Sequence, residues 1–500
     1  MRFERSDLEL FKTASGDRNP LHGDEGYARR TPYGEPVVFG VLAALACLGT
    51  SRVESHRRCS SVVCHFRNPL FAATEYSVER TVDTDEAFAA RIVDGRRALL
   101  DVEASFDRRT AAHRGSCSTV PMPRMARTQA RRLDLQDLTN GQVVSGDYVP
   151  DWSKIRTLGE RTGFDRVGID LVDAGALALL SYLVGMELPG ERALFSAVHL
   201  HLDPGRPHTA DTFAFAMEAG KVDTRINRLT ATVELTVGRA RFGAAELIAF
   251  VRDDVPPIKT SELRARLPEQ PGLAGKSAFV VGGSRGLGAS IVHALSLSGC
   301  DSVFAYERSR DAAEHVVRTA PGPGEVTAER GDAADPRWCR EVVEKIVARY
   351  GGLDFLVANA CPSFGPLDVH PAAIDRILRH VSRSLELTAV PIATCLDALA
   401  LRRGVVVVVS SSAITTTPAE WPHYVAGKCA TEGFVEVAAR QRREVAFLVV
   451  RPPKLVTDLM NTPLGRAGAM LPEPIAATIA ARLAEDRRGE DPIALVDTFQ

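Results

Sequence analysis

The sequence predicts two fold classes within one chain, an α+β half followed by an α/β half with a parallel sheet. Its 500 residues exceed what one hydrophobic core ordinarily organises, so more than one domain is expected. A proline-rich and charged stretch at 253–271 separates two regions whose hydrophobic patterns differ. We therefore expect a linker at 255–272 and a C-terminal domain at 273–500.

Short β-branched runs alternate with helical patterns in the C-terminal half. The runs expected to form strands are Ser277–Val281, Ser302–Tyr306, Phe355–Val357, Val405–Val409 and Ala446–Val450. The expected helices are Gly286–Ser298, Arg337–Tyr350 and Tyr424–Arg442. Strands that alternate with helices form a parallel sheet covered on both faces. The pattern thus predicts a Rossmann-like, doubly wound sheet.

The N-terminal half repeats one order of elements, an apolar helix followed by an alternating strand. The two pairs are Phe39–Gly49 with Ser61–Phe66, and Ala176–Leu188 with Phe195–Leu202. Further strands are expected after each pair, such as Leu99–Phe106 and Thr230–Val237. An apolar helix wrapped by a bent antiparallel sheet is the hotdog fold, so we expect a double hotdog with copies at 1–122 and 138–254. The charge-rich segment Arg124–Asp137 would connect the two copies. The alternative is that the two helix and strand pairs resemble each other by chance and are not a repeat.

The composition argues against nucleic acid, membrane and metal as partners. Lys and Arg number 61 against 63 Asp and Glu, and the net charge of -2 offers no positive field to phosphates or anionic lipids. The N-terminus lacks the apolar core of a signal peptide, and no apolar run reaches the length of a membrane-spanning helix. The nine cysteines include no CxxC pair at zinc spacing. We expect a cytoplasmic protein with reduced thiols.

A glycine-rich turn lies between the first strand and the first helix of the C-terminal half. Its residues are Gly282, Gly283, Ser284, Arg285, Gly286, Leu287 and Gly288. A dinucleotide pyrophosphate would rest on helix N-terminal amides at this point, where a side chain would hold the phosphates away. Tight turns also use glycine, so the cluster by itself is weak evidence for a nucleotide site.

Three polar side chains further along the chain strengthen the nucleotide interpretation. Tyr424 and Lys428 are four residues apart, so both face one side of the predicted helix. Ser411 follows the strand Val405–Val409, which places its hydroxyl at the carboxyl edge of the sheet, where ligands of such folds bind.

Together these residues resemble the short-chain dehydrogenase/reductase family, especially its ketoacyl-thioester reductases, over 272–486. The resemblance implies that Tyr424 protonates the substrate carbonyl oxygen and that Ser411 orients this oxygen. It also implies that Lys428 favours the phenolate and binds the nicotinamide ribose. The cofactor site implied by the resemblance consists of Gly282, Ser284, Arg285, Gly286, Leu287, Gly288, Arg308, Asp332, Asn359, Lys428 and Thr457.

Several positions depart from the pattern of this family. Val281 stands in place of a usual Thr, and Cys361 in place of a usual Gly. The helix asparagine that completes the proton relay of the family aligns with Val381 or Ser382, so water or Ser382 would have to replace it.

Charge after the second strand bears on the choice of cofactor. Ala305 occupies the place where an NAD-specific member of the family carries an acid for the ribose diol. Arg285 and Arg308 instead offer positive charge to a 2′-phosphate. We therefore expect NADPH.

Near the N-terminus, residues 15–22 read Ser-Gly-Asp-Arg-Asn-Pro-Leu-His. This stretch resembles the signature of MaoC-type hydratases and (R)-specific enoyl-thioester hydratases. The resemblance implies that Asp17 and His22 act on one water at a thioester-conjugated double bond, and that the amide near Gly40 polarises the thioester oxygen. Phe39 replaces a usual His. The alternative is turn chemistry, with Asp17 as a cap and His22 as a loop residue. The second copy has no matching motif, so we expect it to be non-catalytic.

A ketoreductase and a dehydratase on one chain would act consecutively on 3-oxoacyl and 3-hydroxyacyl thioesters. We expect an NADPH-dependent, homo-oligomeric enzyme of polyketide or fatty-acyl biosynthesis, with an acyl carrier protein or CoA as the thioester partner. One alternative is a β-oxidation-type enoyl-CoA hydratase and 3-hydroxyacyl-CoA dehydrogenase. Another is a reductase whose hotdog half is a non-catalytic acyl-binding module or scaffold.

Overall fold

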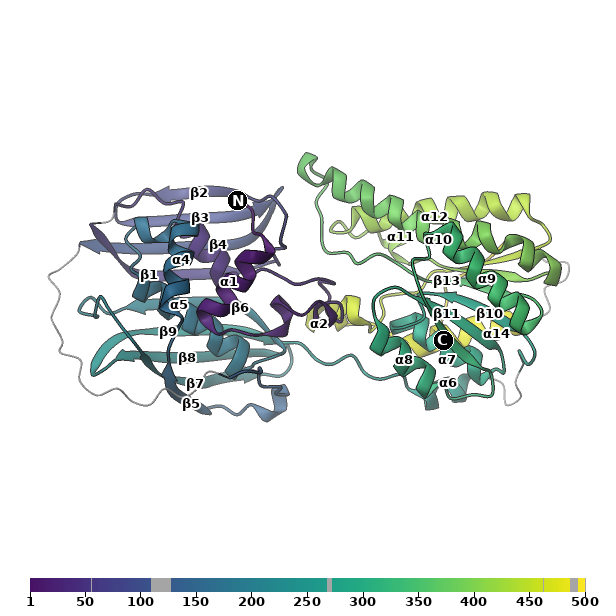
Figure 1. Cartoon of the computed structure of the whole chain (residues 1–500), viewed down its shortest axis with the longest axis horizontal. Helices are drawn as coiled ribbons and strands as arrows, with labels where there is room; N and C mark the ends of the chain where they lie inside the picture. The colour runs from purple at the N-terminus through teal and green to yellow at the C-terminus, as the bar shows by residue number, and fades with distance from the viewer. Residues whose placement is uncertain (55, 109–126, 268–271, 462, 486–492, 500) are drawn as a thin grey trace. The chain divides into compact units, whose positions relative to one another are not determined.

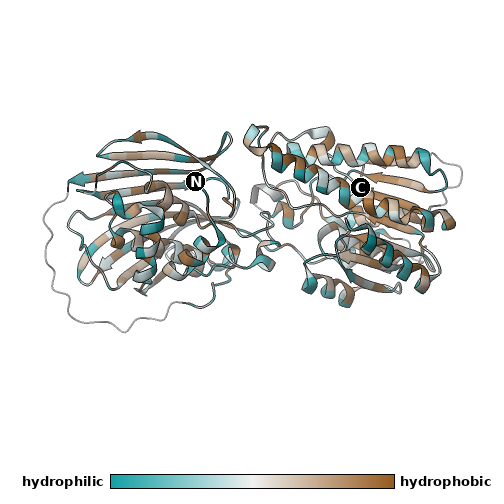
Figure 2. Ribbon diagram, turned by 45° about the horizontal axis from the view of Figure 1, so that its top comes forward, coloured by the Kyte–Doolittle hydropathy of each residue, from teal (hydrophilic) through white to brown (hydrophobic). Residues whose placement is uncertain are grey.

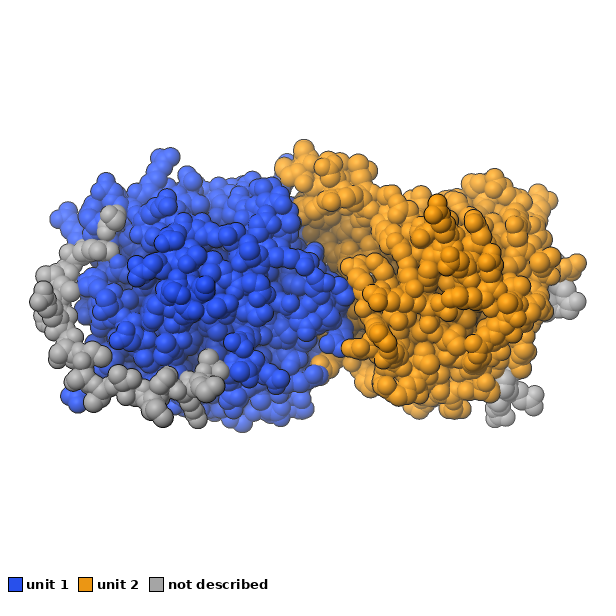
Figure 3. All heavy atoms as spheres, in the orientation of Figure 1, with its two compact units in different colours: residues 1–253, 462–464 blue, residues 254–461, 465–500 orange. Residues whose placement is uncertain are grey.

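The computed structural model describes residues 1–54, 56–108, 127–267, 272–461, 463–485 and 493–499 (Figure 1). The chain divides into an N-terminal unit, Met1–Asp253 with the short segment Thr462–Leu464, and a C-terminal unit that comprises Asp254–Asn461 and Gly465–Gln500 (Figure 3). Three predictions fall partly outside the described residues: the end of the first repeat at 109–122, the start of the connector at 124–126, and linker residues 268–271.

The N-terminal unit is built on a nine-stranded antiparallel sheet with the order β2-β3-β4-β1-β6-β9-β8-β7-β5. The strands are β1 (Arg57–Phe66), β2 (Ser77–Asp83), β3 (Ala87–Asp94), β4 (Arg97–Arg108), β5 (Val143–Tyr148), β6 (Ala193–Leu202), β7 (Phe213–Asp223), β8 (Arg228–Val237) and β9 (Ala240–Val251). The helices are α1 (Arg5–Ser15), α2 (Glu25–Ala28), α3 (Gly40–Leu48), α4 (Trp152–Thr162) and α5 (Leu171–Tyr182). The two predicted helix and strand pairs are α3 with β1 and α5 with β6, and the two strands pair with each other at the centre of the sheet.

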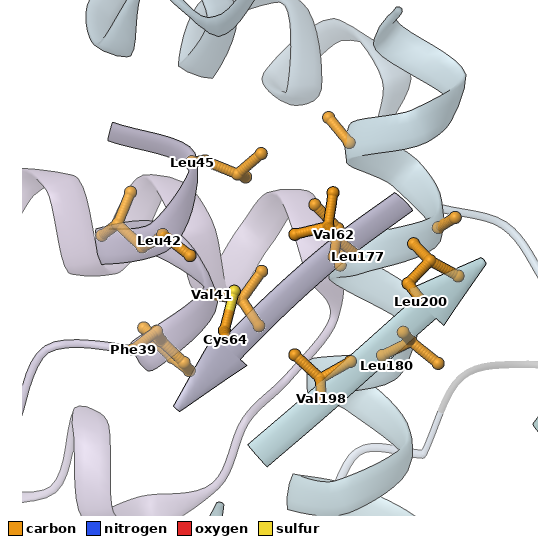
Figure 4. Packing of buried hydrophobic residues seen from close by; sticks show 14 of the residues in the cluster. Phe39, Val41, Leu42, Leu45, Val62, Cys64, Leu177, Leu180, Val198 and Leu200 are labelled. Carbon is orange, nitrogen blue, oxygen red and sulfur yellow. The ribbon is translucent and has the colours of Figure 1, made fainter. Parts of the chain in front are cut away.

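Helices α3 and α5 are buried on nearly all sides and are mostly apolar, as expected for helices within the core of the N-terminal unit; α5 also carries the buried polar residues Asp173 and Ser181. Side chains alternate along the central strands, so Val62 and Cys64 of β1 and Val198 and Leu200 of β6 point toward the helices (Figure 4). The predicted helix Ala176–Leu188 begins earlier, at Leu171, and continues from α5 into a π-helical turn, η4 (Leu183–Glu187).

The two copies of the repeat differ in front of their central helices. Helices α1 and α4 both end at a glycine in the left-handed region, Gly16 and Gly163. In the first copy a 3-10 turn, η1 (Pro20–His22), and helix α2 lie between Gly16 and α3. In the second copy only a short 3-10 turn lies between Gly163 and α5. The segment that carries Asp17 and His22 therefore has no counterpart in the second copy.

The C-terminal unit is built on a seven-stranded parallel sheet with the order β12-β11-β10-β13-β14-β15-β16. The strands are β10 (Ser277–Val281), β11 (Asp301–Tyr306), β12 (Val326–Arg330), β13 (Phe355–Ala358), β14 (Val405–Val409), β15 (Ala446–Val450) and β16 (Ile493–Val496). The helices are α6 (Thr260–Arg266), α7 (Gly286–Leu297), α8 (Arg310–Thr319), α9 (Pro336–Tyr350), α10 (Ile374–Arg402), α11 (Ala413–Thr416), α12 (Pro422–Gln441), α13 (Pro463–Arg466) and α14 (Pro472–Ala484). The predicted Rossmann-like sheet is confirmed.

Successive residues of each parallel strand point into two different core layers. In β10, Ala278 and Val280 pack with α7 and α14, whereas Phe279 and Val281 pack in the layer that includes α9, α10 and α12. Both faces are covered, which is why these strands are almost continuously apolar, as the hydropathy colours show (Figure 2). Among the described helices, the segment Pro371–Arg402 is long and apolar enough to cross a membrane. Part of its apolar surface packs beside the sheet through Ile392, Cys395 and Leu399 of α10.

Candidate active sites

The glycine-rich turn joins β10 to α7 in a conformation that side chains would obstruct. Gly282 and Gly286 have φ angles of 82° and 51°, a region that L side chains rarely adopt. A Cβ on Gly288 would lie 2.0 Å from the Gly282 carbonyl oxygen and 2.6 Å from Nδ2 of Asn359. The Asn359 amide donates a hydrogen bond of 2.9 Å to that same oxygen. The turn is thus held close to the end of β13, and two of the first three residues of α7, Gly286 and Gly288, are glycines, as a phosphate cradle requires.

The charged residues predicted beside this turn already make ion pairs. Nη1 of Arg285 lies 3.0 Å from Oδ2 of Asp458, which follows Thr457, so this guanidinium braces the turn. Arg308 is 59% exposed at the side chain and lies 3.5 Å from Glu307. Of the two arginines that the sequence offers to a 2′-phosphate, Arg308 has the longer ion pair and is therefore the better candidate to bind that phosphate.

The acidic residue predicted after the third strand also has a partner. Asp332 accepts a hydrogen bond of 2.7 Å from Arg383 of α10 and another of 2.9 Å from the amide of Ala334. These contacts fix the carboxylate at the carboxyl edge of the sheet, the edge at which the glycine turn begins.

The structure brings the three predicted catalytic side chains together. The Ser411 hydroxyl, beyond the end of β14, is hydrogen-bonded to Tyr424 of α12. The Lys428 ammonium lies 5.7 Å from the centre of the Tyr424 ring and donates a hydrogen bond of 2.7 Å to the Val409 carbonyl oxygen. One helix turn thus presents the phenol and the ammonium to the same edge of the sheet as Ser411.

The pKa of Tyr424 lies well above the ordinary value for tyrosine, opposite to the lowering expected from Lys428. Burial is the main cause, the neighbouring Cys361 adds to it, and the hydrogen bond with Ser411 opposes it. The Lys428 charge lies over the ring and is bonded to a backbone oxygen. In this geometry the phenol is held protonated, the form in which it can act as an acid.

Residues that the sequence did not single out surround Tyr424. Phe364, in the loop after β13, stacks on the Tyr424 ring with centroids 4.4 Å apart, and it also contacts Trp421 and His423. A phenylalanine in a loop carries no sequence signal for such a contact, because the loop and α12 are far apart in the chain.

The structure also changes the assignment for the missing helix asparagine. Ser382 is exposed, and its hydroxyl donates a hydrogen bond of 2.8 Å to Glu386. The α10 residues that face the turn of Lys428 are instead Ser384 and His380, which lie 3.1 and 3.8 Å from the position of a Cβ on Gly427. The alignment with Val381 or Ser382 is therefore displaced from the residues that contact α12.

In the N-terminal unit, Asp17 is buried against the second copy of the repeat. Its carboxylate is 2% exposed and accepts hydrogen bonds from the Ser181 hydroxyl, at 2.8 Å, and from the Asn19 amide, at 3.0 Å. A Cβ on Gly185 would lie 2.4 Å from its Oδ1, so only glycine leaves room there. Burial raises the pKa of Asp17 to about 6, against the lowering effect of these hydrogen bonds. The sequence motif around Asp17 gave no indication that Ser181 and Gly185 contact its carboxylate.

Asn19 fixes the loop that holds Asp17. Its side-chain amide donates to the carbonyl oxygens of Gly185, Gly190 and Glu191, at 3.2, 3.1 and 3.4 Å. Its own Oδ1 accepts from the amide of Leu21 at 3.0 Å. The candidate site is consequently assembled from both copies of the repeat.

His22 is oriented by one hydrogen bond and one ring contact. Its Nδ1 lies 2.8 Å from the Val37 carbonyl oxygen, which can only accept, so the neutral ring carries its proton on Nδ1. The ring stacks on Phe39 with centroids 3.9 Å apart. Burial lowers the pKa of His22 to about 4, and the charge of Arg252 contributes. Nε2 is left as the basic nitrogen, although no hydrogen bond joins His22 directly to Asp17.

The oxyanion candidate Gly40 is the first residue of α3. A Cβ there would lie 2.6 Å from the ring of Phe66 on β1, so glycine permits close packing of the helix on the strand. Its amide belongs to the first turn of the helix, where backbone amides have no partner within the helix.

Comparisons with known proteins concern the C-terminal unit. A family model described as short chain dehydrogenase matches residues 276–464. An uncharacterized oxidoreductase of Methylorubrum extorquens is 30% identical over 240 residues, which cover 43% of this chain and 93% of that protein. A 3-oxoacyl-acyl-carrier-protein reductase, FabG, of Staphylococcus epidermidis is 28% identical over 195 residues, covering 37% of this chain and 78% of the relative.

Versicolorin reductase 1 of Aspergillus parasiticus is 40% identical over 110 residues, covering 21% of this chain and 42% of the length of that relative. Among solved structures, a short chain dehydrogenase from Burkholderia cenocepacia in complex with NADP superimposes with a TM-score of 0.41 and 28% identity, covering 45% of this chain and 97% of that one. The family model matches most of the C-terminal unit, and the Methylorubrum relative is matched over nearly its whole length. Through this unit, the chain belongs to the short chain dehydrogenase family.

Proposed function

We propose that the chain is a bifunctional ketoreductase and dehydratase that acts on 3-oxoacyl and then 3-hydroxyacyl thioesters in polyketide or fatty-acyl biosynthesis. The observation that carries the reductase half is the cluster of Ser411, Tyr424 and Lys428 at the sheet edge where the glycine turn begins. The FabG relative, whose name specifies a 3-oxoacyl-acyl-carrier-protein substrate, supports a thioester-linked ketone.

The glycine turn fits a dinucleotide, because the absence of a side chain at Gly288 lets the first turn of α7 pack against the Gly282 carbonyl at the end of β10, which is the role of a glycine in such turns. A nicotinamide cofactor, when bound, supplies the hydride for the carbonyl carbon. Tyr424 donates its phenolic proton to the carbonyl oxygen, Ser411 holds that oxygen by its hydroxyl, and Lys428 stabilises the resulting phenolate. Gly282, Ser284, Gly286 and Leu287 would hold the pyrophosphate, with Asn359, Asp332 and Thr457 around the rest of the cofactor.

For the N-terminal unit we infer a double hotdog in which the first copy, 1–122, dehydrates and the second, 138–254, is non-catalytic. The paired α3–β1 and α5–β6 repeats support this fold, and the missing counterpart of the Asp17 loop supports one active copy. Nε2 of His22 would remove a proton from C2, and protonated Asp17 would give its proton to the departing hydroxyl, which leaves as water. The Gly40 amide would bind the thioester oxygen.

The experiment that tests both steps follows the acyl group through the full-length protein. With NADPH and a 3-oxoacyl thioester on CoA or on an acyl carrier protein, mass spectrometry should detect a gain of two hydrogens and then a loss of water. Reduction without dehydration would favour the alternative in which the N-terminal unit only binds acyl groups. No reduction of either thioester would refute the assignment.

Cofactor preference gives a separate prediction. NADPH should bind more tightly than NADH. Arg308→Ala should reduce the ratio of the two dissociation constants by about tenfold, since hydrogen bonds to charged groups contribute about 1.5–3 kcal/mol. Arg285→Ala should narrow it less, because Arg285 is paired with Asp458. The measurement is the dissociation constant of each cofactor by fluorescence, with exposed Arg310→Ala as the control. Equal affinities in the parent protein would instead favour the NAD-linked, β-oxidation-type alternative.

The proposal also includes location and assembly. A cytoplasmic enzyme that meets its substrate on an acyl carrier protein or CoA is consistent with the nearly neutral charge balance. A homo-oligomer is proposed with it, and light scattering of the purified chain would determine its size.

A further inference from the structure

His380 is a buried histidine that the proposed reductase mechanism does not yet use. Its side chain projects from α10 and is 8% exposed, and among the described residues Nε2 has no hydrogen-bond partner. A buried nitrogen that lacks a partner is costly, and it needs either a function or a water to satisfy it.

The imidazole of His380 contacts α12 and also Phe364, the residue that stacks on Tyr424. Its Cδ2, which is bonded to Nε2, lies 3.8 Å from the position of a Cβ on Gly427, the residue before Lys428. The ring makes an edge contact with His423 of α12, with centroids 4.6 Å apart, and another with Phe364 at 5.9 Å. Phe364 in turn stacks on Tyr424. The ring carbon bonded to Nε2 therefore lies beside the helix turn that carries Lys428, next to Ser384.

We infer that His380 is a positioning residue of the reductase site, which relays protons to Lys428 in place of the asparagine that this chain lacks on α10. The inference rests on the proposed ketone reduction. Its basis is the position of a buried polar edge beside the Gly427–Lys428 turn, while Ser382, the replacement expected from the sequence, faces Glu386.

The relay restores the proton that the reaction consumes. When the carbonyl carbon accepts the hydride, the Tyr424 proton moves to the carbonyl oxygen and a phenolate remains. The phenolate regains a proton from the Lys428 side, and Lys428 is reprotonated through the imidazole, or through a water bound to it, from solvent. The ring takes up a proton on one nitrogen and releases one from the other, so its charge is unchanged after each turnover.

The electrostatic surroundings suit a neutral carrier. The pKa of His380 is lowered to about 4 by burial and by the charge of Lys428. The titratable groups that face it are Lys428 and His423 of α12, and Tyr424 lies beyond the Phe364 ring. The imidazole is thus uncharged at neutral pH and does not compete with Lys428 for the phenolate.

Two nearly isosteric substitutions test the relay in the full-length protein. His380→Asn keeps a polar group that can hold a water, whereas His380→Leu removes it at similar volume, so both leave a similar cavity. With NADPH and acetoacetyl-CoA, kcat of the Leu variant should fall about tenfold below that of the Asn variant, a fraction of what general acid catalysis contributes. KM should be similar in both. The solvent deuterium isotope effect on kcat should rise in the Leu variant only.

The control is His293→Leu, which removes another buried histidine of the same unit, on α7, outside the site. It should leave the isotope effect unchanged. If His380→Leu and His380→Asn have equal kcat and equal isotope effects, the relay is overturned while the reductase assignment stands. If the parent protein reduces no 3-oxoacyl thioester, the proposed function fails first, and the relay fails with it.

Discussion

Replacing Tyr424 by Phe is expected to remove ketone reduction and to leave dehydration of a 3-hydroxyacyl thioester unchanged. The substitution deletes the hydroxyl that is bonded to Ser411 but keeps the ring that stacks on Phe364 at 4.4 Å. The protein should therefore fold and bind cofactor as before. The loss should reach about 10²–10⁴-fold, the usual contribution of a positioned general acid.

Two assays on the same preparation measure this result. NADPH oxidation with a 3-oxoacyl thioester reports reduction, and formation of the enoyl thioester from a 3-hydroxyacyl thioester reports dehydration. Ser411→Ala serves as the companion variant, because it removes the partner hydroxyl and leaves the phenol. Retention of more than about 1% of the parent reduction rate by Tyr424→Phe would contradict the assignment of the acid, given the size of general acid catalysis.

The C-terminal fold could be predicted because its signals are local. Each parallel strand is a short apolar run, such as Val405–Val409, and the helices between strands have their own patterns. Ser411, Tyr424 and Lys428 come together because strand ends and one helix turn fix their places within this fold. Whether an arginine is free depends on residues distant in sequence. The sequence predicts that Arg285 offers charge to a phosphate, but Asp458, distant in sequence, lies 3.0 Å away and pairs with it.

The N-terminal site shows the same limit more sharply. The Asp17 and His22 motif could be recognised, and the two helix and strand pairs could be counted. The residues that bury Asp17 could not be predicted from the sequence, because Ser181 lies on the central helix of the other copy and Gly185 on the π turn that follows it. The three carbonyl oxygens that hold Asn19 lack any sequence signal at all, since every residue has one.

Asp17→Asn should abolish dehydration and at the same time stabilise the N-terminal unit at neutral pH. The folded protein raises the pKa of Asp17 from 3.8 to about 6 because the carboxylate is buried. The folded state therefore binds the proton more tightly than the unfolded chain does. The stability gained from this tighter proton binding is complete below pH 4 and is lost as the pH rises through 6. At pH 7 the ionised carboxylate costs on the order of 3 kcal/mol, at about 1.4 kcal/mol per pKa unit.

An asparagine at position 17 removes this cost and keeps both hydrogen bonds, since its oxygen can accept from the Asn19 amide while its amino group donates to the Ser181 hydroxyl. Hydrogen exchange of α1 and α5, measured by mass spectrometry, reports the stability of this unit by itself. The free energy of unfolding of this unit in the variant, compared with that of the parent, should increase from pH 4 to pH 7. In the activity assay, Asp17→Asn combined with His22→Ala should be little worse than either single variant, because residues that act as a unit are not additive. A folded Asp17→Asn protein that dehydrates at the parental rate would overturn the catalytic role of Asp17. The loop of Asp17 and His22 would then at most bind acyl groups, and dehydration would have to come from the second copy of the repeat.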